Sequence, residues 1–420
     1  MNSRPGPSAL IIEEHLVDGN GHYLHYLTGI SAMLARRGFN VTIAANRNWS
    51  GTIRDASMLP WYTRTSSDRY KISIRTPVRI AAAAWHNLTF ALHTLRLVSR
   101  RRSWDLIIMT NVNVFHLAGW RVIWFFGGSR RIRRLVLNSV APVWIYGFDE
   151  QNRRIRHRGA ARIGQLYSLF RREVEKGRIL LTAESDHDAA TLRTLSNCPV
   201  RTLPTPRPDE VVEAALTERR NRDRGASGPV LAWLGRMNRE KGFHLFIAAS
   251  REFLHRNPDV RCTVLIQWLT DDGAEPVPRA EVDALAATDT RLRLLPPARS
   301  STGADYGRLL GRADCLILPY QQALFLGRNS SAALDAAATD CAIITTEGTW
   351  MAEQIGRIVT GFTCADQDSG SLARAMERFV FNHESQLAVA RRLGVAAREK
   401  YSWQRMADLL LEKTPGQLRS

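Results

Sequence analysis

The chain has 420 residues, of which 45% are apolar and 23% are charged. A chain of this length is too long for one ordinary hydrophobic core and predicts two globular domains. Its polar N-terminus argues against a signal peptide. The most apolar later stretch, 114–128, is interrupted by His116 and Arg121. It is also shorter than the roughly 20 residues that a membrane-spanning helix needs.

The net charge is +18, and almost all of it belongs to the first half of the chain. Residues 1–225 hold 35 Lys and Arg against 18 Asp and Glu, a net of +17, with arginine clusters at 100–102, 130–134 and 153–158. A field this one-sided attracts polyanions, so anionic membrane lipid, a pyrophosphate-linked acceptor and nucleic acid are candidate partners. The alternative is a solvated surface in a protein that is rich in arginine.

The five cysteines are spread along the chain without any short C-x-x-C spacing, and several stand inside apolar runs. This pattern predicts small buried hydrophobic residues in a reducing compartment, rather than disulfides or zinc ligands. The cysteines are Cys198, Cys262, Cys315, Cys341 and Cys364.

The first half alternates strands and helices. Strands are predicted at 9–13, 40–45, 105–109, 134–140 and 178–183, and a helix at 22–37. This order is typical of an α/β domain with a parallel sheet. Ser185 stands three residues before Asp188, the spacing of a helix cap, so the acidic run Asp186-His187-Asp188 is interpreted as helix capping rather than a metal site.

A second α/β series follows the polar and proline-containing stretch between 204 and 228. Its predicted strands are 230–234, 262–266, 292–295, 315–318 and 342–345, with helices at 243–255 and 330–339. The sequence thus predicts two Rossmann-like domains, an N-terminal one over 1–210 and a C-terminal one over 226–398. The helix at about 400–420 is expected to pack back on the N-terminal domain.

A glycine loop, Gly19-Asn20-Gly21, separates the first predicted strand from its helix. The third glycine of a dinucleotide-binding loop is replaced by Leu24, and the second strand lacks a terminal acidic residue, which argues against NAD. The loop still offers backbone N–H groups at a helix N-terminus, and His22 is within reach of a substrate there. The alternative is a tight turn needed only for topology.

The clearest candidate site follows the strand at 230–234, where the chain reads Gly-Arg-Met-Asn-Arg-Glu-Lys-Gly. Gly235 and Gly242 let backbone approach a ligand. Arg236 offers a planar fork and Lys241 a point charge, which together suit a diphosphate. The alternative is a solvated basic turn.

A second element, Ser330 and Ser331 at a helix N-terminus, is also suited to phosphate. Asp335, just over one helical turn further on, is a candidate acceptor for ribose hydroxyls. The alternatives are simple N-capping for the serines and an exposed helical carboxylate for Asp335.

These two elements, in this order after a first α/β half, resemble family-4 glycosyltransferases of the GT-B fold. The resemblance covers most of the chain and is best over 230–349. It implies two Rossmann-like domains facing across a cleft, a nucleotide-sugar donor, retention of anomeric configuration and no metal or other cofactor. It also implies that Arg236 and Lys241 hold the donor diphosphate, and that Gly19 and Gly21 lie beside the acceptor and the donor phosphates.

Three positions depart from the family pattern. Of the family's two glutamates, the one that binds ribose falls on Asp335, and the one that contacts the donor sugar falls on Gly327. Where many members have a histidine after the strand equivalent to 105–109, Thr110 and Asn111 stand here, with Asn138 after the next strand. His116 lies nearby but out of register. We interpret the chain as a divergent subgroup.

The sequence therefore predicts a glycosyltransferase that moves a sugar from a nucleoside-diphosphate sugar to a membrane-linked or anionic glycan acceptor, in cell-envelope or exopolysaccharide biosynthesis. The donor side is the C-terminal domain, and the acceptor side includes His22, Thr110, Asn111 and Asn138. The expected location is the cytoplasm, peripheral on the inner face of the cell membrane. The alternatives are a non-catalytic nucleotide-sugar-binding or scaffold protein, and last a nucleic-acid-binding protein.

Overall fold

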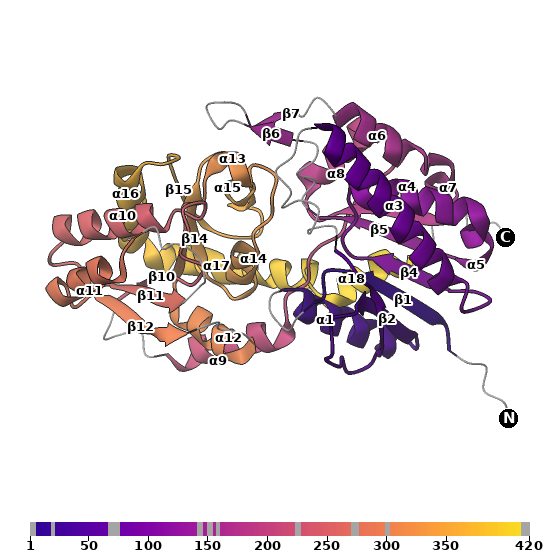
Figure 1. Ribbon diagram of the computed structural model, residues 1–420. Helices are drawn as coiled ribbons and strands as arrows, with labels where there is room; N and C mark the ends of the chain where they lie inside the picture. Colours follow the sequence, from indigo (N-terminus) through magenta and orange to yellow (C-terminus); the bar gives the residue numbers. More distant parts are fainter. Residues whose placement is uncertain are drawn as a thin grey trace. The chain divides into compact units, whose positions relative to one another are not determined.

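The computed structural model describes residues 6–17, 22–65, 76–140, 146–148, 154–156, 160–222, 228–269, 277–298 and 303–412 (Figure 1). The chain forms two compact units. The first comprises Met1–Gln151, Ile155–Pro206 and Trp403–Ser420, and the second comprises Asn152–Arg154 and Arg207–Ser402.

The first unit is built on a seven-stranded parallel sheet in the order β3-β2-β1-β4-β5-β8-β9. Its central strands are continuous apolar runs because both faces of the sheet are covered, as parallel sheets require. All residues of β1, β4, β5 and β8 are buried. The strands are β1 (Ser8–Glu13), β2 (Asn40–Asn46), β3 (Ser57–Tyr62), β4 (Leu106–Met109), β5 (Leu135–Ser139), β8 (Ile179–Ala183) and β9 (Arg201–Thr202). A separate pair joins β6 (Tyr146–Phe148) and β7 (Arg154–Arg156).

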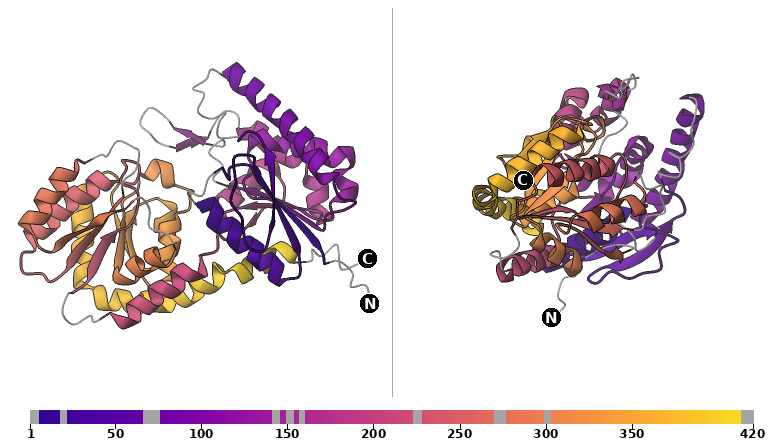
Figure 2. Two further views of the ribbon diagram at one scale, coloured as in Figure 1. Left: turned by 60° about the horizontal axis from the view of Figure 1, so that its bottom comes forward. Right: turned by 90° about the vertical axis from the view of Figure 1, so that its left-hand side faces the viewer.

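Helices cover both faces of this sheet (Figure 2). One face packs against α1 (His22–Arg36) and the C-terminal α18 (Trp403–Leu411). These two helices approach so closely that a Cβ added at Gly29 would lie 1.9 Å from Trp403. The other face packs against α3 (Thr76–Val98), α4 (Val114–Ile123) and α6 (Ala160–Ser168). The remaining elements are the π-helical η1 (Trp124–Gly128), α5 (Ser129–Arg131), α7 (Arg171–Glu175) and α8 (Asp186–Ser196).

The interpretation of Ser185 as a helix cap is confirmed. Its side chain accepts a hydrogen bond of 3.1 Å from the backbone N–H of Asp188 at the start of α8. Asp186 and Asp188 thus occupy the first turn of a helix, where negative charge is favourable.

The second unit contains a six-stranded parallel sheet in the order β12-β11-β10-β13-β14-β15. Its strands are β10 (Val230–Trp233), β11 (Thr263–Leu269), β12 (Leu292–Ala298), β13 (Cys315–Leu318), β14 (Ala342–Thr346) and β15 (Gly361–Cys364). Its longer helices are α9 (Asp209–Asn221), α10 (Phe243–Arg256), α11 (Arg279–Thr288), α12 (Gly303–Arg312), α14 (Ser331–Ala338), α16 (Ser369–Phe381) and α17 (His383–Lys400). Two shorter ones are α13 (Gln322–Phe325) and α15 (Trp350–Gln354).

All five cysteines are buried and unpaired, as predicted. Among the described residues, no helix combines the length and the apolar character needed to cross a membrane.

Candidate functional site

The direction of strand order reverses between β10 and β13 in the second sheet. In open parallel sheets, such a switch point leaves a crevice at the carboxyl ends of the two strands, where ligands bind. At this crevice, the loop after β10 and the loop after β13 contact each other closely. Gly242 has a φ of 76°, and a Cβ added to it would lie 2.2 Å from the carbonyl oxygen of Pro319. The backbone N–H of Gln321 donates to the carbonyl of Glu240 at 3.0 Å.

The predicted diphosphate ligand Lys241 lies in this switch-point crevice. Its backbone N–H donates to Oδ1 of Asn238 at 3.0 Å, which closes the turn. The Nζ atom of Lys241 lies 5.5 Å from the centroid of the Tyr320 ring. A Cβ added at Gly235 would lie 3.9 Å from the same Nζ atom. The ammonium therefore lies near Gly235, two residues after the end of β10. Arg236 is exposed in the same loop, so two cations share the carboxyl edge of the sheet.

The serines at the start of α14 differ in their roles. Ser330 is buried, and its Oγ accepts a hydrogen bond of 3.4 Å from the backbone N–H of Ala333. It is therefore the N-cap of the helix, the structural alternative recognised from the sequence. Ser331 is exposed at the first helical position. The free N–H groups of this helix end remain suited to an anion.

Asp335 is buried, so its interpretation as an exposed helical carboxylate is wrong. Its Oδ1 lies 3.3 Å from Nε of Arg207, and its Oδ2 accepts a hydrogen bond of 3.4 Å from the Tyr306 hydroxyl. Burial raises the pKa of Asp335, and the charge of Arg207 opposes that rise. Neither partner could be recognised from local sequence patterns, because Arg207 comes from the start of the second unit and Tyr306 from α12. The ribose-binding role of Asp335 remains a prediction.

The first sheet has its own switch point, between β1 and β4. Gly19 and Gly21, predicted to bind phosphate near it, lie outside the described residues. The backbone of His22 opens α1, while its side chain also lies outside the described part. The described residues at this edge are those that end β1, β4 and β5.

Thr110 and Asn138, predicted on the acceptor side, are buried and hydrogen-bonded to the strand ends. The Thr110 hydroxyl donates to the carbonyl of Ile12 at 3.2 Å and also to the Glu13 carboxylate. Asn138 donates to the carbonyl of Thr110 at 3.0 Å and accepts from the Thr182 hydroxyl at 2.8 Å. These two side chains therefore tie the carboxyl ends of four neighbouring strands together.

Asn111 lies at the same edge, together with Tyr23, Glu13 and His15. Asn111 is half-buried and hydrogen-bonds the Tyr23 side chain, whose pKa burial raises. The Glu13 carboxylate accepts hydrogen bonds of 2.9 Å from the backbone N–H and from Nδ1 of His15. The His15 ring in turn stacks on Tyr23, with 5.7 Å between ring centroids.

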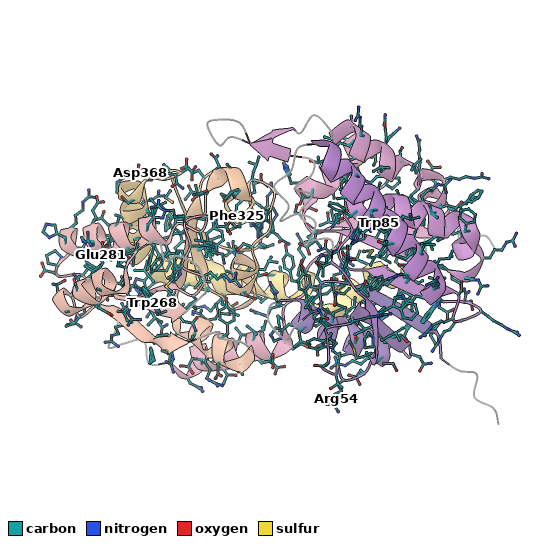
Figure 3. All side chains as sticks on the ribbon, in the orientation of Figure 1. Arg54, Trp85, Trp268, Glu281, Phe325 and Asp368 are labelled. Carbon is teal, nitrogen blue, oxygen red and sulfur yellow. The ribbon has the colours of Figure 1, made fainter. Side chains whose placement is uncertain are left out.

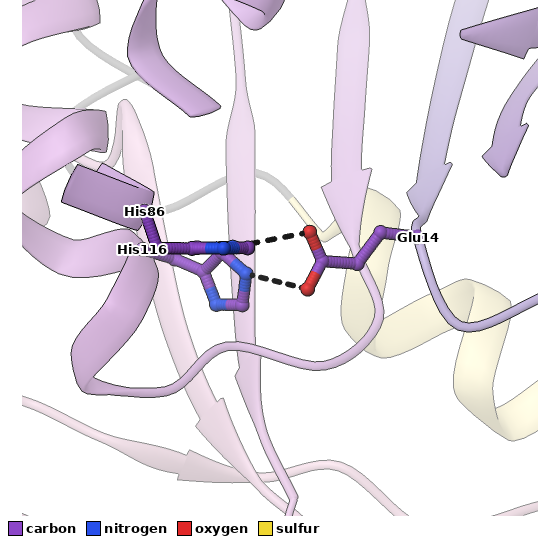
Figure 4. Close-up of side chains that lie close together, drawn as sticks. All are labelled: Glu14, His86 and His116. Atoms are coloured by element: carbon purple, nitrogen blue, oxygen red, sulfur yellow. Dashed lines mark hydrogen bonds and ion pairs between the residues drawn. The ribbon is translucent and has the colours of Figure 1, made fainter. Parts of the chain in front are cut away.

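A buried carboxylate, Glu14, lies between two histidines from different helices (Figure 4). Nε2 of His116 is 3.1 Å from its Oε1, and Nε2 of His86 is 3.3 Å from its Oε2. His116 is the third residue of α4, and its Nδ1 accepts from the backbone N–H of Asn113 at 3.3 Å. Since Nδ1 accepts a hydrogen bond, the proton of a neutral His116 is on Nε2, and this N–H donates a hydrogen bond to Glu14.

This tautomer decides what the cluster of Glu14, His86 and His116 can hold. The ligand atoms of the three residues lie within 4.8 Å of one another, a spacing that a metal ion could span. A metal-bound histidine, however, donates its other ring N–H to an acceptor. His116 instead receives a backbone N–H on Nδ1, so its Nε2 lone pair is occupied by the proton. The geometry therefore fits a hydrogen-bonded network better than a metal site.

Burial and the neighbouring charges act in opposite directions on the pKa values of Glu14 and His116. Burial alone would raise the pKa of Glu14, but His116 and His86 together hold it well below its ordinary value. Burial lowers the pKa of His116, and Glu14 only partly opposes that effect. The network is thus an ionised carboxylate that accepts a hydrogen bond from a neutral imidazole.

A cavity of about 560 Å³ in the second unit lies at the other edge of the sheet. Asp314 directly precedes β13 and Asp340 lies two residues before β14, so this edge of the sheet is the amino-terminal one. Two of the arginines that line the cavity are engaged with the fold: Arg219 donates to the carbonyl of Ala313 at 2.6 Å, and Arg398 pairs with Asp340 at 2.7 Å. The cavity lies away from the switch point, and we interpret it as part of the framework. Its lining is Leu216, Arg219, Arg220, Arg222, Asp340, Arg391 and Arg398.

Residues 228–382 match the family model described as Glycosyl transferases group 1. The match covers most of the second unit, including the turn at Lys241, the start of α14 and Asp335. No curated protein matches the chain in sequence.

Solved structures resemble the chain over nearly its whole length. Sucrose-phosphate synthase from Thermosynechococcus elongatus is 13% identical with a TM-score of 0.63, and the match covers 96% of this chain and 97% of that one. HepE from Anabaena, solved with UDP and glucose, is 14% identical with a TM-score of 0.58, over 96% and 99% of the two chains. A trehalose 6-phosphate synthase from Burkholderia multivorans is 12% identical with a TM-score of 0.63, over 97% of each chain.

At these identities the likeness shows the fold, which is the GT-B fold expected from the sequence. The two parallel sheets with helices on both faces agree with it. Since the second unit also carries a group 1 glycosyl transferase domain, the chain is identified as a glycosyltransferase.

Proposed function

Starting from a glycosyltransferase of the GT-B fold, we propose that the chain transfers a sugar from a nucleoside-diphosphate sugar, with retention of configuration, to a membrane-linked or anionic glycan acceptor. The donor binds at the switch point of the second unit, and the acceptor binds to the first unit. The reaction serves cell-envelope or exopolysaccharide biosynthesis at the inner face of the cell membrane.

The observation that carries the donor half of this proposal is the position of Lys241. Its ammonium lies over Tyr320 and beside Gly235, at the carboxyl edge of a parallel sheet where ligands bind. As the bond between the sugar and the diphosphate breaks, negative charge grows on the leaving group. Lys241, Arg236 and the N-terminus of α14 are suited to stabilise that charge, which is how a preorganised site accelerates such a reaction.

The acceptor half of the proposal rests on the first unit. Its excess of positive charge suits an anionic acceptor or an acceptor carried on anionic lipid. Thr110 and Asn138 act there by positioning the strand ends, because their polar atoms are engaged with neighbouring strands. Asn111 and His22 are the predicted residues left to contact the acceptor directly.

The proposal is tested by thermal unfolding of the full chain with UDP, GDP, ADP, CMP and their sugars. UDP is the first choice because HepE is solved with UDP and with UDP-glucose. One nucleoside diphosphate is expected to stabilise the chain, by about 2.7 kcal/mol at a hundred times its Kd. Lys241→Ala is expected to remove most of this stabilisation.

Lys400→Ala is a matched control, because Nζ of Lys400 also lies 5.5 Å from a tyrosine ring, that of Tyr401. This control should keep the nucleotide response. Equal responses of Lys241→Ala and wild type, or no response of the wild type to any nucleotide, would contradict the donor site.

The non-catalytic alternative is kept because a glycine, Gly327, stands where the family has its sugar-binding glutamate. Release of nucleoside diphosphate from the stabilising donor, with a glycan acceptor present, separates the two. Turnover supports the enzyme, and binding without turnover supports the alternative. We also propose that no metal is needed, so turnover should survive EDTA. Loss of turnover that Mg²⁺ restores would contradict this.

A further inference from the structure

The outer face of α3 carries apolar side chains that the described residues of the first unit leave exposed. Trp85, Leu88 and Leu92 follow one another at helical spacing and are all at least half exposed, and Trp85 is 55% exposed (Figure 3). The opposite face of the helix, with Phe90 and Leu97, packs into the core. Exposed apolar stripes of this kind mark interaction surfaces.

A second apolar element lies where α4 passes into η1. Phe125 is 74% exposed and Phe126 is 66% exposed, and their rings touch edge to face with 5.3 Å between centroids. The helical path breaks at Phe126 and at Gly127, which has a φ of 109°, whereas Trp124 beside them is buried. π-helical segments of this kind occur frequently at functional sites.

The two elements face the same way. The inner faces of α3 and α4 share one hydrophobic core on one face of the seven-stranded sheet, so their outer faces point away from that sheet together. Asn87 of α3 holds them side by side, donating to the carbonyl of Val114 at 3.0 Å and accepting from the N–H of Gly119 at 2.9 Å. We call the exposed residues Trp85, Leu88, Leu92, Val122, Phe125 and Phe126 the aromatic face.

Positive charge accompanies the aromatic face. The sequence from 76 to 134 holds ten arginines, no lysine and a single acidic residue, Asp105. Asp105 is engaged, since it accepts from the backbone N–H of Ser8 at 2.8 Å and pairs with Arg133 at 3.0 Å. Arg96 is exposed one turn beyond Leu92, and Arg130 is exposed four residues beyond Phe126.

We propose that the aromatic face docks on an anionic lipid membrane. Aromatic rings favour the level of the lipid headgroups, and arginines around them can bind lipid phosphate. A protein partner would need an apolar surface rimmed by acidic residues, and a second copy of this face would bring arginine against arginine. This inference rests on the proposed function in one respect, because a membrane-linked acceptor gives the docking its purpose.

The test is sedimentation of the full chain with vesicles of phosphatidylcholine alone, and with vesicles that also contain phosphatidylglycerol. The wild type should bind the anionic vesicles, and less so at high salt. Phe125→Ser with Phe126→Ser should weaken this binding by roughly tenfold or more, since two rings lose their burial. Arg96→Gln with Arg130→Gln should weaken it by roughly fivefold per arginine.

Phe381→Ser is the matched control, because Phe381 is 65% exposed on α16 of the second unit. It should bind anionic vesicles as the wild type does, and all variants should keep the wild-type Tm and nucleotide response. Wild-type affinity of the Phe125/Phe126 variant, or equal binding to neutral vesicles, would overturn the proposal. So would self-association of the wild type in solution that the same variant abolishes, which would assign the face to a second copy. If the wild type did not bind vesicles but kept its nucleotide response, the result would contradict the docking surface alone and would not affect the donor site.

Discussion

The Nε2–H of His116 donates a hydrogen bond of 3.1 Å to the buried carboxylate of Glu14, while Nδ1 of His116 accepts a hydrogen bond from the backbone N–H of Asn113. The imidazole thus links the cap of α4 to the end of β1. It does so inside an aromatic environment, with the Phe90 ring centroid 4.9 Å from its own.

His116→Phe should therefore destabilise the first unit. The phenyl ring fits the aromatic surroundings but removes the hydrogen bond from His116 to Oε1 of Glu14, at a cost of about 1–3 kcal/mol. Urea unfolding measures this loss. His255→Phe, at an exposed position of α10, is the control and should change stability by less than about 0.5 kcal/mol. Equal stability of His116→Phe and wild type would show that Glu14 has another sufficient partner.

The same pair predicts a loss of stability in acid. Glu14 and His116 both have a pKa in the fold below the ordinary values of 4.5 and 6.5. A group with a lowered folded pKa contributes stability that is present above its unfolded pKa and is lost as the pH falls. The wild type should hence begin to lose stability below pH 6.5, first through His116 and then through Glu14.

The measurement is the free energy of unfolding from pH 8 to pH 5 for wild type and His116→Phe. The difference between the two should shrink as the pH falls, because the imidazole contribution disappears. A difference that stays constant over this range, or grows in acid, would contradict the assigned protonation states.

The sequence could predict what depends on neighbours along the chain. The alternation of strands and helices, the cap at Ser185 and the turn from Gly235 to Gly242 are local patterns, and the fold and the position of Lys241 followed from them. The helix α3 was missed for a physical reason. Apolar side chains occupy its exposed face as well as its buried one, so its periodicity is blurred.

The Glu14 network could not be predicted, because it joins the residue after β1 to side chains from α3 and α4 that are far apart in sequence. His116 looked out of register when compared by position after a strand, yet the start of α4 at Val114 turns it back toward β1. The partners of Asp335 were hidden for the same reason. Arg207 and Tyr306 lie far from it in sequence and meet it only in the folded unit.

Gly242 offers a test of the contact between the two loops at the donor site. Gly242→Ala must place a Cβ 2.2 Å from the Pro319 carbonyl oxygen at a φ of 76°. The φ alone costs about 1–2 kcal/mol, and the clash adds to it by separating the loops. Thermal unfolding should show a clear loss, and nucleotide binding should weaken because Lys241 moves with the loop.

Gly356→Ala is the matched control for this change. Gly356 lies in the same unit with a φ of 81°, but a Cβ there meets nothing within 4 Å. It should lose only the conformational part and keep its nucleotide response. If both glycine variants lost the same stability and bound nucleotide equally, the contact with Pro319 would have no role in the site.

The Arg207–Asp335 pair can be separated from the proposed ribose contact by a double-mutant cycle. Arg207→Gln, Asp335→Asn and the double variant are compared at pH 8. Both side chains are largely buried, so each single change leaves the remaining charge without its opposite charge. The coupling energy is expected to be about 1–3 kcal/mol. Additive losses would show that the two residues stabilise the fold independently.

Nucleotide titration of the same variants then tests the ribose contact. If Asp335 accepts a ribose hydroxyl, Asp335→Asn must weaken nucleotide binding more than Arg207→Gln does, whereas equal effects would assign Asp335 to the framework of α14.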